Sequence, residues 1–413
     1  MHQEIYQHTF ANGLTLLAER MPHVRSAAFS LSVRAGCAYD PPEHLGLAGI
    51  LSELIMRGAG SRDNRELTLA LDGLGVDRSE SVGLIQMYFG GATLARNLGP
   101  ALELYADILR RPHLPEEELE AARSLALQEL QGLEDDPQSK VMVELRKRHY
   151  PAPLNRDQRG DEAGVSALTI NALRSFYQRY FQPAEMIVSV AGDIDWPKLR
   201  DLIERLYGDW RPQAVAMPFV GPDGPSSEHM TKDLDQTQIG IAYRSVPIND
   251  PGYYAARGAV GVLSGGMSAR LFTEVREKYG LCYAIHASHE TMKDRANVIC
   301  FTAGKPERAQ ELLERTLHEL KRLKDGIEGE EVARVQAGLK SSLIMRQEST
   351  GARASQMASD WYLLGRVRSV EEIQAAIDGL SPESIVAHLR LCPPKDFTIV
   401  TLGPKELAHS HSD

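Results

Sequence analysis

The chain has 413 residues, 43% of them hydrophobic and 25% charged, with a formal net charge of −10. This length exceeds the size at which a single hydrophobic core stops growing, so two domains of roughly 200 residues each are expected. The acidic balance argues against a nucleic-acid-binding surface, and no apolar run approaches the ~18 residues that would cross a bilayer, so peptides or proteins are the expected partners.

The first half of the chain mixes strand-like and helix-like segments. Residues 27–33 alternate in the manner of a half-buried strand, and residues 45–57 have helical periodicity. A further strand is expected at residues 84–89 and an amphipathic helix at residues 98–110. The short connection at residues 76–81 favours antiparallel pairing of the elements around it.

The middle of the chain interrupts this regularity. Residues 211–231 are rich in proline, glycine and serine and have no usable periodicity, which predicts a domain linker. The sequence therefore predicts an N-terminal domain of residues 1–210 and a C-terminal domain of residues 232–413.

The second half repeats the order of elements of the first. Strands are expected at residues 238–243 and 297–302, and helices at residues 253–263 and 309–324. The long helices that follow also match, because residues 114–119 correspond to residues 327–332 at an offset of roughly 213 positions (327 minus 114). This correspondence indicates an internal duplication.

Strands and helices are mixed without a strict βαβ alternation, so the predicted class is α+β. Each duplicated domain is expected to be a mostly antiparallel sheet packed against long helices. The four cysteines form no Cys-x-x-Cys pair and are expected to be reduced; they are Cys37, Cys282, Cys300 and Cys392. The first ten residues lack a basic region followed by an apolar one, so the cytoplasm is the default expectation, and the periplasm is the alternative if a signal peptide was removed.

Three segments carry the candidate chemistry: residues 46–54, 127–130 and 265–283. In this order and spacing they resemble the insulinase family, the inverted-motif zinc peptidases that include pitrilysin and the mitochondrial processing peptidases. The resemblance runs over nearly the whole chain. It is specific in the third segment and degenerate in the first.

Active members of that family carry His-x-x-Glu-His on the first long helix, where two histidines on one face ligate zinc and the glutamate activates a water. The resemblance places Gly49 and Glu53 at the two histidine positions and Ser52 at the position of the catalytic glutamate. Glu129 matches the family's third ligand, a glutamate on a later helix. Two ligands and the base are therefore absent, and no metal is expected in this chain.

Other metal sites are disfavoured by the residue types that are left. Glu53 and Glu129 without imidazole or thiolate suit a weak oxygen site rather than zinc, and the simpler interpretation is a solvated or paired carboxylate. The remaining histidine candidates are not spaced four apart on a helix: His44, His286 with His289, and His409 with His411.

The third segment contains the residue pair that the family uses on the substrate side. The resemblance implies that Arg276 and, seven residues on, Tyr283 reach towards a substrate across from the zinc. The alternative is structural: Arg276 would pair with Glu274 or Glu277 on a helix surface, and Tyr283 would belong to a strand core.

Some members of this family divide the work between two similar chains, one with the zinc motif and one with the arginine–tyrosine pair. The resemblance implies that this chain is the second kind, inactive alone, with a zinc-bearing homologous subunit and unfolded peptides as partners. Tyr283 would then donate a hydrogen bond to the developing oxyanion, and Arg276 would hold a substrate carbonyl or share that charge. Two alternatives remain, a catalytically inactive structural paralogue and a self-associating peptide binder.

Overall fold

The computed structural model describes residues 3–213, 220–221 and 226–408. The chain forms two compact units, and each unit takes segments from both halves of the sequence. Unit 1 comprises Met1–Gly132, Arg156–Val220 and Arg346–Tyr362, and unit 2 comprises Leu133–Asn155, Gly221–Met345 and Leu363–Asp413. Both units combine a sheet with helices, so the predicted α+β class is confirmed.

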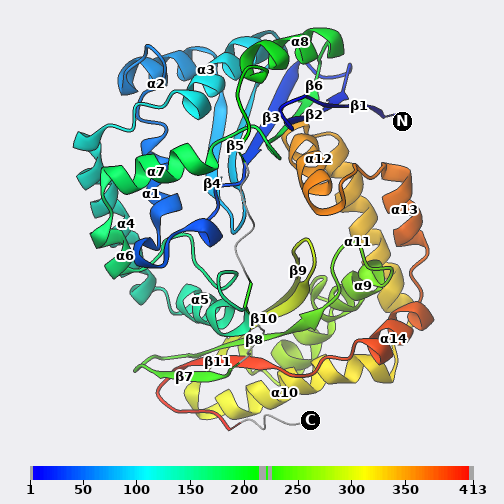
Figure 1. The fold of residues 1–413 in the computed structure, drawn as a ribbon. Helices are drawn as coiled ribbons and strands as arrows, with labels where there is room; N and C mark the ends of the chain where they lie inside the picture. Colours follow the sequence, from blue (N-terminus) through cyan, green and yellow to red (C-terminus); the bar gives the residue numbers. More distant parts are fainter. Residues whose placement is uncertain (1–2, 214–219, 222–225, 409–413) are drawn as a thin grey trace. The chain divides into compact units, whose positions relative to one another are not determined.

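Unit 1 contains a six-stranded sheet in the order β1-β2-β6-β3-β5-β4 (Figure 1). Its strands are β1 (Glu4–Thr9), β2 (Thr15–Arg20), β3 (Ser26–Val33), β4 (Asp77–Val82), β5 (Met87–Leu94) and β6 (Ile187–Gly192). Its helices are α1 (Leu47–Leu54), α2 (Asn64–Gly73), α3 (Leu98–Arg110), α4 (Leu119–Asp135), α6 (Glu162–Ala167), α7 (Ile170–Tyr180), α8 (Trp196–Tyr207) and α12 (Thr350–Leu364).

Unit 2 contains a five-stranded sheet in the order β7-β11-β8-β10-β9. Its strands are β7 (Glu228–Thr231), β8 (Thr237–Ser245), β9 (Cys282–Thr291), β10 (Ala296–Gly304) and β11 (Thr398–Gly403). Its helices are α5 (Pro137–His149), α9 (Tyr253–Ser264), the π-helix η5 (Leu271–Lys278), α10 (Ala309–Arg322), α11 (Gly329–Gln347), α13 (Val370–Asp378) and α14 (Pro382–Leu391).

The two sheets share one topology, which supports the predicted duplication. Strands β2-β6-β3-β5-β4 of unit 1 correspond in order to β7-β11-β8-β10-β9 of unit 2. In each sheet the first pair of this series is parallel and the other pairs are antiparallel. Strands β4 and β9 therefore occupy equivalent edges. The expected division of the sequence at residues 211–231 stays a prediction, and residues 214–219 and 222–225 of that range lie outside the described residues.

The alternating pattern of β8 explains how unit 2 is layered. Ile239, Ile241 and Tyr243 point into the core cluster that α9, α10 and α14 complete. Ala242 points to the other face, where Leu145 of α5 packs. Figure 1 shows α5 alongside the same sheet. Each face of this strand is thus covered by helices, as its nearly complete burial requires.

Helix α5 belongs to the first half of the sequence but is anchored in unit 2. Its buried His149 makes hydrogen-bond contacts of 2.8 Å through Nδ1 with Thr398 Oγ1 and through Nε2 with Asn297 Oδ1. A Cβ on Gly240 would lie 2.9 Å from Val141 Cγ1, so glycine at this position allows the helix to approach the sheet closely.

The counterpart of this exchange is α12, which belongs to the second half of the sequence but is anchored in unit 1. Its Arg353 donates from Nε to Glu19 Oε2 of β2 at 2.6 Å, and both side chains are buried. Helices α5 and α12 begin 213 positions apart (350 minus 137), so equivalent helices of the two repeats are exchanged between the units.

Three predicted boundaries were wrong for local reasons. The helix expected at residues 45–57 is shorter and corresponds to α1. It begins only at Leu47, because Gly46 has a φ of 95°, a left-handed conformation that cannot lie inside an α-helix. Residues 76–81, expected as a connection, mostly belong to strand β4. The turn follows it, where Gly83 N donates to Gln86 O at 2.8 Å, so the strand expected at residues 84–89 begins only at Met87.

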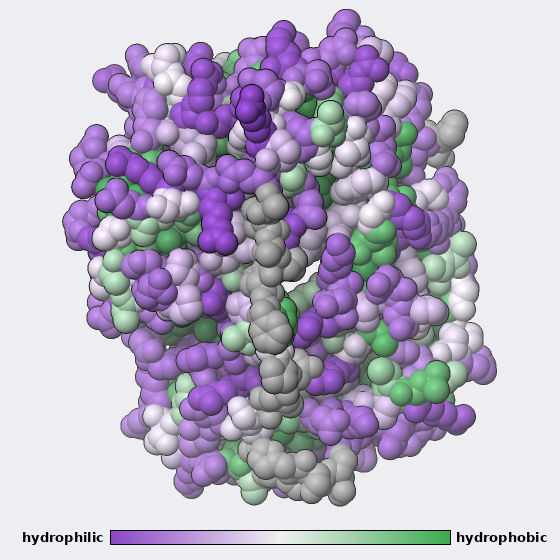
Figure 2. All heavy atoms as spheres, viewed as in Figure 1, coloured by the Kyte–Doolittle hydropathy of each residue, from purple (hydrophilic) through white to green (hydrophobic). Residues whose placement is uncertain are grey.

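Figure 2 shows one face of the molecule, on which hydrophilic residues predominate and apolar residues form small separate patches. The cysteines within the described residues are all unpaired, in agreement with the expected reduced thiols. Among the described helices, none combines the length and the apolar character that a bilayer crossing requires.

Candidate functional site

The segment that carries the arginine–tyrosine pair begins with a turn and continues as a π-helix. Helix α9 ends at Ser264, and Gly266 adopts a φ of 153°, which favours glycine. The following π-helix η5 is anchored by Leu271 and Val275, which are both fully buried in the core of unit 2. π-Helical turns are rare and recur at functional sites.

Arg276 and Tyr283 lie next to one another in the structure. The guanidinium carbon of Arg276 lies 4.7 Å from the centroid of the Tyr283 ring and 4.5 Å from that of the Phe272 ring. Tyr283 is on edge strand β9 and is 78% exposed, so it does not belong to a strand core. Aromatic rings at these distances attract the cation through their π-electron faces.

The carboxylate of Glu274, two residues before Arg276, is paired with another group. Glu274 binds Lys278 Nζ at 2.8 Å, and this pairing lowers the pKa of the Glu274 carboxyl. Within residues 226–408 as described, Arg276 forms neither an ion pair nor a hydrogen bond, so the expected alternative of pairing with Glu274 or Glu277 is not what the structure contains. The in-plane N–H groups of Arg276 therefore remain available to a ligand.

The four degenerate zinc-site positions come together in unit 1. Gly49, Ser52, Glu53 and Glu129 line one cavity of about 230 Å³ formed by α1, α4, β4 and the segment around Gln158. The sequence-based grouping of these residues therefore corresponds to one place in the structure.

Gly49 is predicted to stand at the first histidine position of the motif, and the space beside it is occupied. A Cβ on Gly49 would lie 2.7 Å from the main-chain carbonyl oxygen of Gln158, closer than real Cβ atoms come. Ser52 donates from Oγ to the Gly49 carbonyl oxygen at 2.7 Å, so it is engaged with its own helix. An imidazole at position 49 does not fit unless the backbone at residue 158 moves.

The segment that fills this space is held by polar contacts of Arg156. Arg156 Nη1 donates to the carbonyl oxygens of Ala38 and Asp40. The carboxylate of Asp40 accepts from Gly46 N at 2.9 Å and from Ala48 N at 3.0 Å at the start of α1. Burial raises the pKa of Asp40 to about 7, although these N–H donors favour its charged form. Residues 156–159 and the start of α1 are thus fixed against each other.

The carboxylates of this cavity do not form a zinc ligand set. Glu53 Oε2 lies 3.9 Å from Arg57 Nη2, a loose pairing at an exposed site. Burial raises the pKa of Glu80, which accepts a hydrogen bond from Tyr105, and the Glu53 charge adds to this effect. The part of the chain that the structure describes contains no group of three or more His, Cys, Asp or Glu side chains placed to hold a metal ion. His409 and His411 lie outside the described residues.

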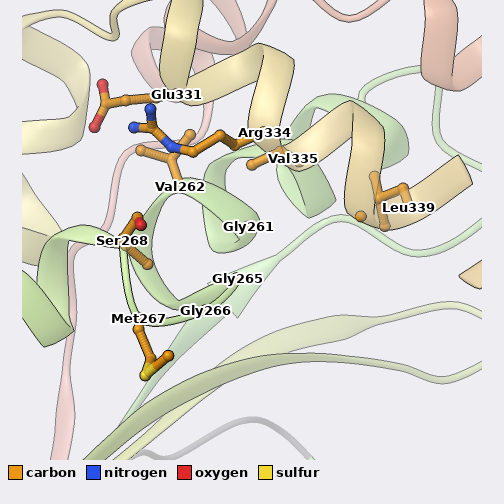
Figure 3. Close-up of a pocket in the computed structure, with 12 residues that line it drawn as sticks. Gly261, Val262, Gly265, Gly266, Met267, Ser268, Glu331, Arg334, Val335 and Leu339 are labelled. Carbon is orange, nitrogen blue, oxygen red and sulfur yellow. The ribbon is translucent and has the colours of Figure 1, made fainter. Parts of the chain in front are cut away.

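Unit 2 has a cavity of about 250 Å³ at the equivalent place. Figure 3 shows residues of α9, the following turn and α11 around it, with Met267 pointing away from α11. Three of its lining residues lie 213 positions (335 minus 122) after three that line the unit 1 cavity: Val335, Gly338 and Leu339 after Ala122, Leu125 and Ala126. Glu331 at its rim is held by Arg270 through two contacts of 2.7 Å.

Sequence reasoning missed three residues of these sites. Phe272 lies one turn before Arg276 on the π-helix, and its spacing could have suggested a shared helix face. Gln158 acts through its main-chain carbonyl oxygen, and the Asp40 carboxylate accepts from the backbone N–H groups of Gly46 and Ala48; neither contact has a sequence signal.

Comparison with protein families places each half of the chain. Residues 15–160 match insulinase (peptidase family M16), and residues 167–339 match the peptidase M16 inactive domain. An uncharacterized zinc protease of Rickettsia felis is 25% identical over 402 residues, covering 96% of this chain and 97% of that protein. The uncharacterized zinc protease YmxG of Bacillus subtilis is 25% identical over 406 residues, covering 97% of this chain and 98% of that protein.

Two solved structures share the fold. A peptidase M16 inactive domain from Pseudomonas fluorescens superposes with a TM-score of 0.89 at 20% identity, covering 98% of this chain and 99% of that one. A protease from Helicobacter pylori superposes with a TM-score of 0.90 at 19% identity, covering 98% of this chain and 100% of that one. The two family matches together span most of the sequence, and the residues at the His-x-x-Glu-His positions are Gly49, Ser52 and Glu53. This chain therefore belongs to the insulinase family, peptidase family M16, as a member without the zinc motif.

Proposed function

We propose that this chain is the zinc-free subunit of a two-chain M16 metallopeptidase that hydrolyses unfolded peptides. The observation that carries the proposal is the exposed Tyr283 with the Arg276 guanidinium over its ring. A tyrosine with 78% of its surface exposed contributes little to packing, so stability does not account for its placement.

The chemistry available at this pair is stabilisation of negative charge. Within the described residues no group hydrogen-bonds to the Tyr283 hydroxyl, so it is free to donate to the oxygen that becomes negative during amide hydrolysis. Arg276 would hold a neighbouring substrate carbonyl or share that charge through its in-plane N–H groups. Because neither group activates a water, the pair assists hydrolysis without starting it.

The zinc and the general base would come from a homologous subunit with an intact motif. Gly49 and Glu53 do not replace two imidazoles, so this chain itself is proposed to need no cofactor. In the absence of such a partner we expect a homodimer. Substrate would bind as an added strand along a sheet edge of the zinc-bearing subunit, which favours unfolded peptides over folded proteins.

The test is reconstitution from two separately purified chains. This chain is mixed with a zinc-bearing M16 protein encoded in the same genome, and hydrolysis of an unstructured fluorogenic peptide is measured with and without chelator. We expect each chain alone to be nearly inactive and the mixture to be active, chelator-sensitive and stable through gel filtration.

Three outcomes would contradict the proposal. Hydrolysis by this chain alone, unchanged by further purification and abolished by chelator, would mean that unit 1 does support a metal. A stable complex whose turnover does not depend on Arg276 or Tyr283 would favour the structural paralogue, and peptide binding by a self-associated chain without hydrolysis would favour the binder.

A further inference from the structure

A second aromatic ring, Phe272, contacts the same guanidinium as Tyr283. The centroid of the Phe272 ring lies 4.5 Å from the guanidinium carbon of Arg276, slightly closer than the ring of Tyr283 at 4.7 Å. Phe272 and Arg276 are four residues apart on π-helix η5, and Tyr283 comes from strand β9. The Arg276 guanidinium thus lies near one ring from the helix, Phe272, and one ring from the strand, Tyr283.

Phe272 has no evident role in the core of unit 2. Its neighbours Leu271 and Val275 are fully buried members of the core cluster around α9, α10 and α11, whereas the half-buried Phe272 is not part of that cluster. Its described ring contact is with Arg276. An apolar ring that is left partly exposed beside a cation is explained by that contact better than by packing.

Within the described residues, the rings of Phe272 and Tyr283 are the contacts that hold the Arg276 side chain in place. The nearby Glu274 is bound to Lys278, and no acidic group of the described chain pairs with the guanidinium. A long arginine side chain without such contacts would sample many rotamers, and ordering it on substrate binding would cost conformational entropy. Contact with ring faces restricts the guanidinium while leaving its in-plane N–H groups unpaired.

We infer that Phe272 is a positioning residue of the arginine–tyrosine site: its ring holds the Arg276 guanidinium against Tyr283, so that both donors meet the substrate in one arrangement. This inference rests on the proposed function for its catalytic consequence, but the positioning itself is a property of the single chain. The two can therefore be tested separately.

The first experiment measures positioning in the full chain alone. The side-chain Nε–H resonance of Arg276 is assigned by comparison with Arg276→Lys, and ring currents are expected to displace it from the other arginine resonances. Phe272→Leu should move it towards them, and Phe272→Trp, which restores a strong cation–π partner, should keep it displaced. Phe397→Leu is the matched control, because Phe397 packs against the same core and lies near Lys321.

The second experiment measures turnover by the two-chain enzyme. Phe272→Leu should lower kcat/KM by roughly twofold to tenfold, mainly through KM, and Phe272→Trp should restore it. Phe397→Leu should leave it unchanged. A purely structural ring would instead lower the melting temperature and leave KM as it was.

The two experiments together distinguish failure of the positioning role of Phe272 from failure of the proposed function. An unchanged Arg276 resonance in Phe272→Leu overturns the inference whatever the turnover. A moved resonance with unchanged turnover, in an enzyme that still depends on Tyr283, overturns the positioning role and leaves the proposed function standing. Turnover that depends on neither Tyr283 nor Phe272 overturns the proposed function together with the catalytic part of this inference.

Discussion

The two units of this molecule repeat one topology but treat the same location differently. In unit 1 the cavity beside α1 is lined by Glu53, Glu80 and Glu129, and the main-chain carbonyl oxygen of Gln158 would lie 2.7 Å from a Cβ on Gly49. In unit 2 the equivalent cavity is lined mainly by small and apolar residues, and the polar chemistry lies on the π-helix and strand that follow, at Arg276 and Tyr283.

The two units share one scaffold, and they differ in the space beside these positions. With glycine at position 49, the Gln158 carbonyl oxygen occupies the space that a side chain there would need. In unit 2, by contrast, Tyr283 is 78% exposed. The exposed Tyr283 with the Arg276 guanidinium over its ring is the main support for proposing a function in unit 2.

The largest effect is expected at the exchanged helices, whose anchors differ between the units. Arg353→Ala leaves Glu19 as a buried carboxylate without its ion pair, and we expect a loss of about 3–5 kcal/mol in the free energy of unfolding. The matched control is Arg20→Ala on β2, the strand that carries Glu19. This substitution breaks an exposed pair with Glu4 and should lower the free energy of unfolding by less than about 1 kcal/mol. Urea unfolding of both variants measures the difference, and equal losses would show that burial of the pair is irrelevant.

The next largest effect is expected at the Arg276–Tyr283 pair of unit 2, and it tests whether this pair takes part in turnover. Tyr283→Phe removes one hydroxyl donor and should lower kcat of the reconstituted enzyme by on the order of 10²–10³, the usual cost of one oxyanion donor. Association and melting temperature should not change, because the side chain is 78% exposed. Arg276→Ala should lower turnover as well, with a larger share in KM. Full turnover by the double variant in an intact complex would make the structural paralogue the better interpretation.

Sequence patterns predicted some parts of this molecule much better than others. The helix at residues 98–110 and the strand β10 were found within two residues, because their apolar periodicity reflects strong burial on one or both faces. Strand β4 was missed because it is an edge strand whose residues are mostly exposed and polar. The exchange of α5 and α12 has no local signal, because a buried face does not specify which sheet covers it.

The candidate site was predictable to a similar degree. The motif spacing predicted Arg276 and Tyr283 as a pair, and the structure places the two side chains next to one another, but their role in catalysis stays a prediction. The four predicted zinc-motif positions line one cavity. It could not identify Gln158, which acts through a carbonyl oxygen that every residue has. The pairing of Glu274 with Lys278 rather than Arg276 agrees with helical spacing, because residues four apart face each other and residues two apart do not.

A pH titration sharpens the contrast, because burial shifts the pKa of the buried Asp40 in unit 1 and of the half-buried His289 in unit 2 in opposite directions. Burial raises the pKa of Asp40 from 3.8 to about 7 in unit 1. The folded protein therefore binds this proton more tightly than the unfolded chain, and this stabilisation, complete at low pH, is lost as the pH rises through 7. Burial lowers the pKa of His289 in unit 2 to about 4, so its contribution is complete above about pH 6.5 and is lost as the pH falls through 4.

The measurement is the unfolding free energy of wild type and of Asp40→Asn at pH 5 and pH 8. We expect wild type to lose roughly 2–3 kcal/mol more than the variant over this interval, from about 1.4 kcal/mol for each pKa unit. His289→Gln is the control for the other unit and should change the profile only on the acidic side. An identical pH dependence in wild type and Asp40→Asn would mean that Asp40 is ionised throughout.

The smallest effect is expected at the cavity beside Gly49 in unit 1. The test is whether substitutions that introduce the zinc motif there produce metal binding. A chain with Gly49→His, Ser52→Glu and Glu53→His has the ligand types of the family, but a Cβ at position 49 meets the Gln158 carbonyl oxygen at 2.7 Å. We expect no stoichiometric zinc by metal analysis, and a stability loss of about 1–2 kcal/mol from overpacking. Glu53→His alone should be tolerated, because that side chain is half exposed. One zinc per chain with an unchanged melting temperature would show that residues 156–159 yield easily, and that only the residue types, not the packing, separate unit 1 from an active peptidase domain.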